Sequence, residues 1–157
     1  MKADEPAVQD VMRRSMVARI ATLSRNGRPS ITPLYFVCIN GHLWLSTSDW
    51  TLAARDAKAN PNVSILLDMT HIPHDHRILR IMGRANVQTY TKLPRSYVFW
   101  VALKYSLSPG GLRNNLAHLR QLRLMNRYHA QSKEKGLPCI IEVTSEQVEF
   151  LNDHRLG

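Results

Sequence analysis

The sequence of 157 residues predicts a mainly β protein with inserted helices (α+β), in which six or seven antiparallel strands form a small barrel. Two observations support this fold class. Short segments rich in β-branched and aromatic residues recur along the chain, and tight-turn sequences join several of them. Helical segments are inserted between these strands, and closing the sheet would protect its edges. With 44% hydrophobic residues, we expect one domain over residues 1–157.

The first part of the chain predicts a short helix followed by three strands. Asp4 can cap a helix that has Pro6 in its first turn. Two turns, Asn26–Gly27 and Asn40–Gly41, then separate the segments VARIATLS, ITPLYFVCI and HLWLSTS. Because consecutive tight turns join neighbouring strands, these three segments predict an antiparallel meander.

The next part predicts a helix and two further strands. The segment DWTLAARDAKANPNV favours a helix that ends at Asn60–Pro61. The apolar run VSILLD is expected of a strand that is covered on both faces. In the following strand, RILRIMGRANV, Gly83 indicates a bulge or a close approach of another backbone.

A helical insertion is predicted over about 92–133, with one helix from Lys92 to Leu107 and another from Leu112 to about Lys133. Trp100 lies in the first of these helices and is expected to be a core aromatic. Two short strands, CIIEVT and QVEFL, follow near the C-terminus.

The formal charge of +9 is the strongest compositional feature, and it suits a nucleic-acid surface, an anionic ligand or a basic soluble protein. Arg113, Arg120 and Arg127 recur every seven residues and form a basic stripe. No base-reading motif accompanies the stripe, so we do not expect a nucleic-acid partner. The stripe is expected to face solvent or to line the mouth of a site for anionic ligands.

Other residue types exclude several classes of protein. No apolar run reaches the length of a membrane span, and the polar N-terminus does not resemble a secretory signal, so we expect a soluble, cytoplasmic protein. Cys38 and Cys139 lie in apolar segments and are expected to pack as small hydrophobic residues. The segment HIPHDHR is expected to be a solvated turn rather than a zinc or copper site, because its proline makes it a loop.

Four pieces of the sequence, in this order and spacing, resemble the pyridoxamine 5′-phosphate oxidase-like split-barrel family. They are ARIATLSRNGRPSITPLYFV, LWLSTS followed by a short helix, NPNVSILLD and RIMGRANV, over roughly residues 17–87. The ending CIIEVTSEQVEFL fits the last strands of the family. The resemblance implies a split antiparallel barrel that forms a homodimer and binds a flavin-type cofactor at the dimer interface.

The resemblance implies that the strand after the N-G-R-P turn runs along the flavin. By position, that strand comprises Thr32, Pro33, Leu34 and Tyr35. A flat ring needs an apolar wall and a few fixed hydrogen-bond partners, which such a strand supplies. The alternative is that Thr32–Pro33 only blunts an exposed sheet edge.

The second element of the implied site is STSDWT, just before the short helix. Hydroxyl groups and unpaired amides at a helix N-terminus suit a phosphate. Trp50 is a candidate lid over the flavin ring. The alternative is an ordinary helix cap by Ser48 or Asp49. The candidates in this element are Ser46, Thr47, Ser48, Trp50 and Thr51.

The sequence also departs from the family pattern. Many flavin-binding members carry a lysine, or an Arg-Lys pair, where this chain has Leu52, Ala53 and Ala54. A phosphate without a cationic partner lacks charge-assisted hydrogen bonds. The cations that can replace that lysine are Arg28, Arg55, Arg80 and Arg84. The chain also stops sooner than the true oxidase, although His154 and Arg155 can still reach a site.

These features predict an oxidoreductase that binds FMN and passes hydride or electrons to or from a small molecule. The cofactor carries the chemistry in such an enzyme, so no catalytic side chain is predicted. The alternatives are a deazaflavin-dependent reductase of the same fold and a non-enzymatic protein that binds haem or flavin.

Overall fold

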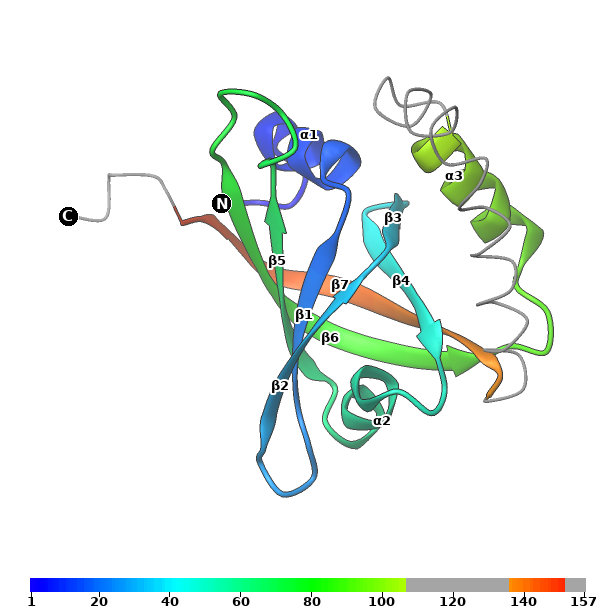
Figure 1. The fold of residues 1–157 in the computed structure, drawn as a ribbon. Coiled ribbons are helices and arrows are strands. Elements are labelled where there is room, and N and C mark those ends of the chain that lie inside the picture. Colours follow the sequence, from blue (N-terminus) through cyan, green and yellow to red (C-terminus); the bar gives the residue numbers. More distant parts are fainter. Residues whose placement is uncertain (107–135, 152–157) are drawn as a thin grey trace.

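The structure is a computed structural model that describes residues 1–106 and 136–151. Within these residues, seven antiparallel strands form a curled half-barrel sheet accompanied by three helices (Figure 1). The predicted mainly β class is therefore confirmed. The helix predicted over 112–133, and His154 and Arg155, lie outside the described residues. The elements are α1 (Pro6–Arg14), β1 (Ala18–Leu23), β2 (Pro29–Leu34), β3 (Phe36–Ile39), β4 (His42–Ser48), α2 (Leu52–Ala59), β5 (Asn62–Asp68), β6 (Ile78–Thr89), α3 (Arg95–Ser106) and β7 (Pro138–Phe150).

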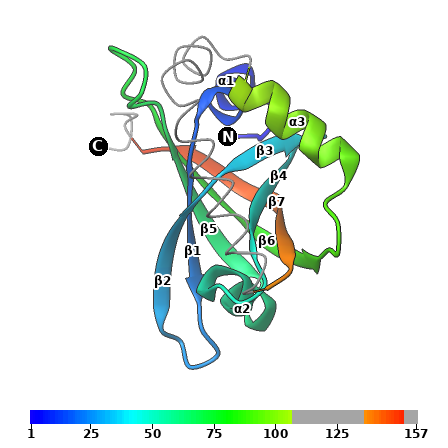
Figure 2. The ribbon, with the colours of Figure 1, turned by 45° about the vertical axis from the view of Figure 1, so that its right-hand side comes forward.

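The two predicted hairpins are present, but the predicted three-stranded meander is wrong. β1 pairs with β2 and β3 pairs with β4, and Gly27 and Gly41 take positive φ of 76° and 79° in the two turns. The order across the sheet is β2-β1-β5-β6-β7-β4-β3, so β2 and β3 form opposite edges. Only Tyr35 separates them in the chain, and Figure 2 shows this segment crossing from one side of the curled sheet to the other. The whole sheet curls, and this curl brings the two edge strands together. No single turn sequence predicts the curl.

The core lies inside the curl of the sheet. Ile20, Leu45, Ile65, Ile81 and Ile141 are fully buried there, from five different strands. The helices α1 and α2 pack at the two ends of this core, as Figure 1 shows. The cap residue of α1 is Glu5 rather than Asp4, and its side chain makes no capping hydrogen bond. Cys139 is buried as expected, and Cys38 packs against the core.

The pairing of β6 with β7 explains Gly83. A Cβ atom at this glycine would lie 2.1 Å from the carbonyl oxygen of Thr144, so the two backbones approach too closely for any side chain. The register also shifts between Met82 and Gly83, which leaves Glu146 as an extra residue on β7. Both features predicted for Gly83 are confirmed. The two predicted C-terminal strands are one strand of 13 residues, because the bulge bends the strand without ending it.

The helix α3 covers the outer face of the β3–β4 edge. Tyr97 is buried against Val37 and Ile140, and its ring stacks on Trp44 at a centroid distance of 6.4 Å. Trp100 was expected in the core but is 42% exposed, although it follows Tyr97 by three residues and lies on a neighbouring part of the helix surface. None of the helices in residues 1–106 and 136–151 is long and apolar enough to span a membrane.

The outer face of β5 is only partly covered. Side chains on this strand alternate between buried and half-buried, so one face packs in the core and the other is reached by solvent. The expectation of two covered faces is therefore wrong for the single chain.

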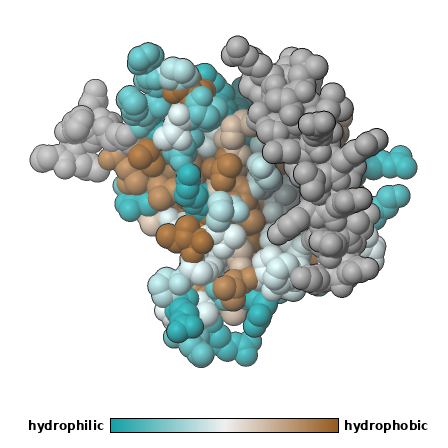
Figure 3. Space-filling view, in the orientation of Figure 1, coloured by the Kyte–Doolittle hydropathy of each residue, from teal (hydrophilic) through white to brown (hydrophobic). Residues whose placement is uncertain are grey.

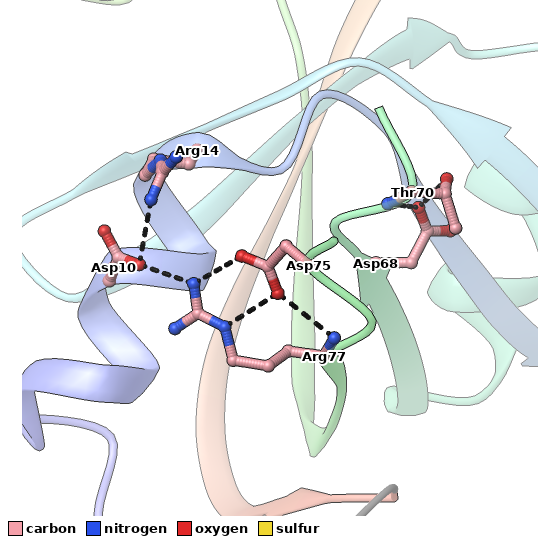
Figure 4. Close-up of polar contacts among 6 residues, drawn as sticks. All are labelled: Asp10, Arg14, Asp68, Thr70, Asp75 and Arg77. Atoms are coloured by element: carbon pink, nitrogen blue, oxygen red, sulfur yellow. Dashed lines mark hydrogen bonds and ion pairs between the residues drawn. The ribbon is translucent and has the colours of Figure 1, made fainter. Parts of the chain in front are cut away.

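An ion-pair cluster connects α1 to the loop between β5 and β6 (Figure 4). The guanidinium of Arg77 contacts Asp10 at 2.8 Å and Asp75 at 2.7 Å. The hydrogen bond from Arg77 lowers the pKa of Asp75 to about 2. The described residues contain no group of three or more His, Cys, Asp or Glu side chains placed to hold a metal ion.

Candidate functional site

The two segments predicted to hold a cofactor meet where β2 bends into β3. The backbone amide of Ser46 donates a hydrogen bond to the carbonyl oxygen of Tyr35, with a distance of 3.2 Å. One residue further on, Phe36 pairs with Leu45 across the hairpin. The segment at 32–35 therefore adjoins the start of the segment at 46–51, as expected for a hairpin with a two-residue turn at Asn40–Gly41.

The hydroxyl groups before α2 form a closed network. The Thr47 and Thr51 hydroxyl oxygens lie 2.9 Å apart, and the Thr51 hydroxyl donates to the carbonyl of Ser48 at 2.9 Å. Thr51 also accepts from the amide of Ala54 at 3.3 Å and is the cap residue of α2. The capping alternative is thus partly right, with Thr51 in place of Ser48 or Asp49. A phosphate at this point would have to replace one of these partners.

The predicted hydroxyl groups do not converge on one point. Successive side chains of a strand point to opposite faces. Thr47 shares the inner face with the buried Leu45, whereas Ser46 and Ser48 lie on the opposite face. On that face Ser46 hydrogen-bonds the Tyr97 hydroxyl of α3; burial raises the pKa of Tyr97 and this bond partly lowers it. Ser46 therefore contributes to the packing of α3.

The same alternation applies to the strand predicted to run along the flavin, so its side chains also point to two opposite faces. Thr32 pairs with the buried Ile20, and Leu34 packs on the core, so both face inward. Pro33 faces outward and is exposed, and Tyr35 is 59% exposed. The structure places β2 at a sheet edge, as proline indicates. Only Pro33 and Tyr35 of this strand are thus available as an external wall.

The ring of Tyr35 packs against the ring of Tyr105. The two rings make an edge-to-face contact with centroids 5.2 Å apart. The Tyr105 hydroxyl oxygen lies 2.9 and 3.0 Å from the carbonyl oxygens of Met16 and Phe36, to either of which its single proton can be donated, and it accepts from the Phe36 amide at 3.1 Å. Burial raises the pKa of Tyr105, so this hydroxyl stays protonated. The sequence contains no local signal for this anchor, because Tyr105 is 69 residues from Phe36.

Three of the four candidate cations, Arg28, Arg55 and Arg80, have different surroundings. Arg28 is exposed beside the β1–β2 turn, where its amide bonds the Ser24 hydroxyl at 3.0 Å. Arg55 is exposed on α2, one turn from the cap. Arg80 forms an ion pair with Glu149 on the adjacent strand β7. Since Glu149 neutralises Arg80, Arg28 and Arg55 are the better partners for a phosphate.

Asp49 and Trp50 connect α2 to the beginning of β7. The Asp49 carboxylate accepts from the Leu137 amide at 3.1 Å, and the Asp49 amide donates to the Leu137 carbonyl at 3.1 Å. Trp50 is 52% exposed and lies against Gly136, where an added Cβ would be 2.6 Å from its ring. Asp49 therefore has a structural role, and the exposed Trp50 remains a candidate lid.

A cavity of about 660 Å³ lies elsewhere, between α1, the β3–β4 turn and α3. None of the residues predicted for the cofactor lines it. Lys104 contributes to its wall, and burial lowers the pKa of this amine to about 7.

A curled antiparallel sheet whose two edge strands are joined at a single bend defines a split-barrel protein. This chain belongs to the pyridoxamine 5′-phosphate oxidase family, since the family model of that description matches residues 4–152. No curated protein matches its sequence.

Several solved structures share the fold at low sequence identity. The conserved hypothetical protein Rv2991 from Mycobacterium tuberculosis is 18% identical, with a TM-score of 0.64 over 98% of this chain and 88% of that one. An F420 reductase is 16% identical, with a TM-score of 0.61 over 90% and 94% of the two chains. HutZ, the haem storage protein from Vibrio cholerae, is 18% identical, with a TM-score of 0.56 over 95% and 94%.

Proposed function

We propose that this protein is an oxidoreductase that binds FMN at the junction of β2, β3 and β4, between two copies of the chain. The observation that carries the proposal is the hydrogen bond between Ser46 and Tyr35, because it brings the backbones of the two predicted segments side by side. Membership of the pyridoxamine 5′-phosphate oxidase family supports a flavin as the ligand.

Different residues at this junction suit the planar ring and the phosphate of a flavin. Pro33, Tyr35 and Trp50 are exposed and apolar, so they can wall a planar ring. At the start of α2, the first-turn amides of Leu52 and Ala53 have no acceptor within the helix and suit an anion. Bound FMN would supply hydride or electron transfer, while these residues would orient the ring and exclude water.

The proposed homodimer would use the outer face of β2, β1 and β5. On this face Ile31 is 69% exposed and Leu23 is 38% exposed. Figure 3 shows apolar side chains between polar ones on the face that carries these strands. A second chain would cover the outer side of β5, whose apolar sequence is typical of a strand with two covered faces.

A deazaflavin is the second candidate cofactor, and the residues at the start of α2 favour it. Leu52, Ala53 and Ala54 supply no cation to a terminal dianionic phosphate. A basic rim containing Arg28 and Arg55 would suit a long polyanionic tail that passes over it. The structure of an F420 reductase is among those that share the fold.

Parallel titrations test the proposal. We expect the purified dimer to bind FMN with quenched flavin fluorescence, at one FMN per chain. Arg55→Gln should weaken FMN binding by about tenfold, because it removes a charge-assisted contact to the phosphate. Arg14→Gln, an equal charge change on α1, should leave binding unchanged.

Three results would overturn the assignment. Tighter binding of a deazaflavin than of FMN would favour the second candidate. Haem binding with a Soret band and no flavin binding would make the protein a haem binder. Failure to bind any of the three would remove the redox function altogether. The oligomeric state, from light scattering on a sizing column, tests the dimer separately.

A further inference from the structure

The cavity between α1, the β3–β4 turn and α3 has the composition of a small-molecule site. Its volume of about 660 Å³ lies within the range of ligand pockets. In Figure 2, α3 runs across the sheet beside α1 and β3, the elements that supply the walls. The lining residues that matter for the argument are Met12, Arg13, Cys38, Trp100, Leu103 and Lys104.

Lys104 is the most unusual group in this wall. Its Nζ atom is buried, and within the described residues it has no hydrogen-bond acceptor. It lies 3.4 Å from the centroid of the Phe36 ring and 5.6 Å from that of Tyr105. An aromatic face compensates part of the charge of an ammonium group, but its three donors remain without acceptors. Burying an amine without hydrogen-bond acceptors lowers the stability of the fold, and a bound ligand that supplies an acceptor would remove this cost.

The charged side chains in the cavity wall indicate whether that partner is an anion or a cation. The lining includes two cationic side chains, Arg13 and Lys104, and no carboxylate. Cys38 is the other titratable group there, and burial raises its pKa, so its thiol is neutral. The rest of the wall is mainly apolar, from Met12, Val37, Trp100 and Leu103.

We propose that this cavity binds a small organic acid with an apolar, aromatic body, whose carboxylate is held by the amine of Lys104. The site shares no residue with the proposed cofactor site and does not depend on it. The amine would turn from the Phe36 ring toward the ligand, which the flexible lysine stem allows. The carboxylate would supply the missing acceptors, and the aromatic body would pack against Trp100 and Leu103.

Binding of such an acid should depend on pH. Burial lowers the pKa of Lys104 to about 7 in the free protein, and a bound carboxylate would raise it again. Below pH 7 the amine is already charged; above it, a proton must be taken up, so affinity falls as pH rises. The other titratable groups near the amine do not interfere, because burial raises the pKa of both the Cys38 thiol and the Tyr105 hydroxyl and both stay protonated throughout this range.

Calorimetric titration with a matched ligand pair tests the proposal. The probes are 4-phenylbutyrate and its uncharged analogue 4-phenylbutan-1-ol. We expect the acid to bind roughly tenfold or more tightly at pH 6.5 than at pH 8.5, and the alcohol to show no such change. Lys104→Met should remove the pH dependence and weaken only the acid, because methionine keeps the apolar stem. Lys92→Met, at an exposed position before α3, is the matched control.

Several outcomes would overturn the assignment. One is that neither probe binds. Another is that the acid and the alcohol bind with equal affinity at both pH values. A third is that Lys104→Met and Lys92→Met lose the same affinity for the acid. If Lys104→Met does not fold, the ligand pair and the pH profile of the unmodified protein still decide. Either result is independent of flavin binding.

Discussion

The substitution Gly83→Ala should strongly destabilise the protein. The added Cβ would lie 2.1 Å from the Thr144 oxygen and 2.9 Å from its carbonyl carbon. Both are backbone atoms, so no side chain can turn away to make room. The strands β6 and β7 form the longest pairing in the sheet, and separating them would break hydrogen bonds in the middle of this ladder. We expect a loss of about 3 kcal/mol, at the upper end of overpacking effects.

Urea unfolding followed by circular dichroism measures this loss. The midpoint should fall while the slope stays the same, which separates a change of stability from a change of the unfolded state. For a chain of this size, the corresponding decrease in melting temperature is roughly 6–12 °C. Ser64→Ala, on the outer face of β5, is a control that should change stability by less than about 0.5 kcal/mol. A Gly83→Ala variant as stable as the original protein would refute the close-approach argument.

Three further predictions concern single contacts. Thr51→Ala should destabilise the protein by about 1 kcal/mol in urea unfolding because it removes the α2 cap, and Thr51→Ser should retain most of the stability; equal losses would contradict a capping role. Tyr105→Phe should cost about 1–3 kcal/mol in the same assay, because it leaves the amide and carbonyl of Phe36 without their partner; an unchanged midpoint would argue against this anchor. Because the folded-state pKa of Asp75 is lowered to about 2, its contribution is present above pH 4 and lost as pH falls toward 2. Melting temperatures should therefore fall less between pH 5 and pH 2.5 in Asp75→Asn than in the original protein, and parallel curves would disprove the Arg77 pairing.

Local chemistry was enough to predict several elements correctly. Asn40 and Gly41 take positive φ in their turn, which is why that dipeptide predicts a hairpin from sequence. Gly83 was recognisable because a glycine inside a strand has few explanations other than a bulge or a close backbone. These predictions succeeded because one or two neighbouring residues were enough to make each of them, although the atom that crowds Gly83 belongs to the distant Thr144.

Two predictions that depended on contacts beyond the local segment were wrong. The turns around β2 and β3 indicated a meander, yet the two strands lie at opposite edges. Trp100 has helical spacing relative to Tyr97, but a helix face is buried only if another element covers it. The cofactor residues remain predictions, although the contact between Tyr35 and Ser46 brings their two segments together.

The order of residues alone was sufficient for the strands, the tight turns and the family pattern, because these follow from side-chain size and backbone preference over short distances. The curl of the sheet decided where Asp49 and Tyr105 find partners. It also enclosed the Lys104 amine beside a cavity. Burial and charge pairing arise between segments that are distant in the chain, so only the folded arrangement shows them.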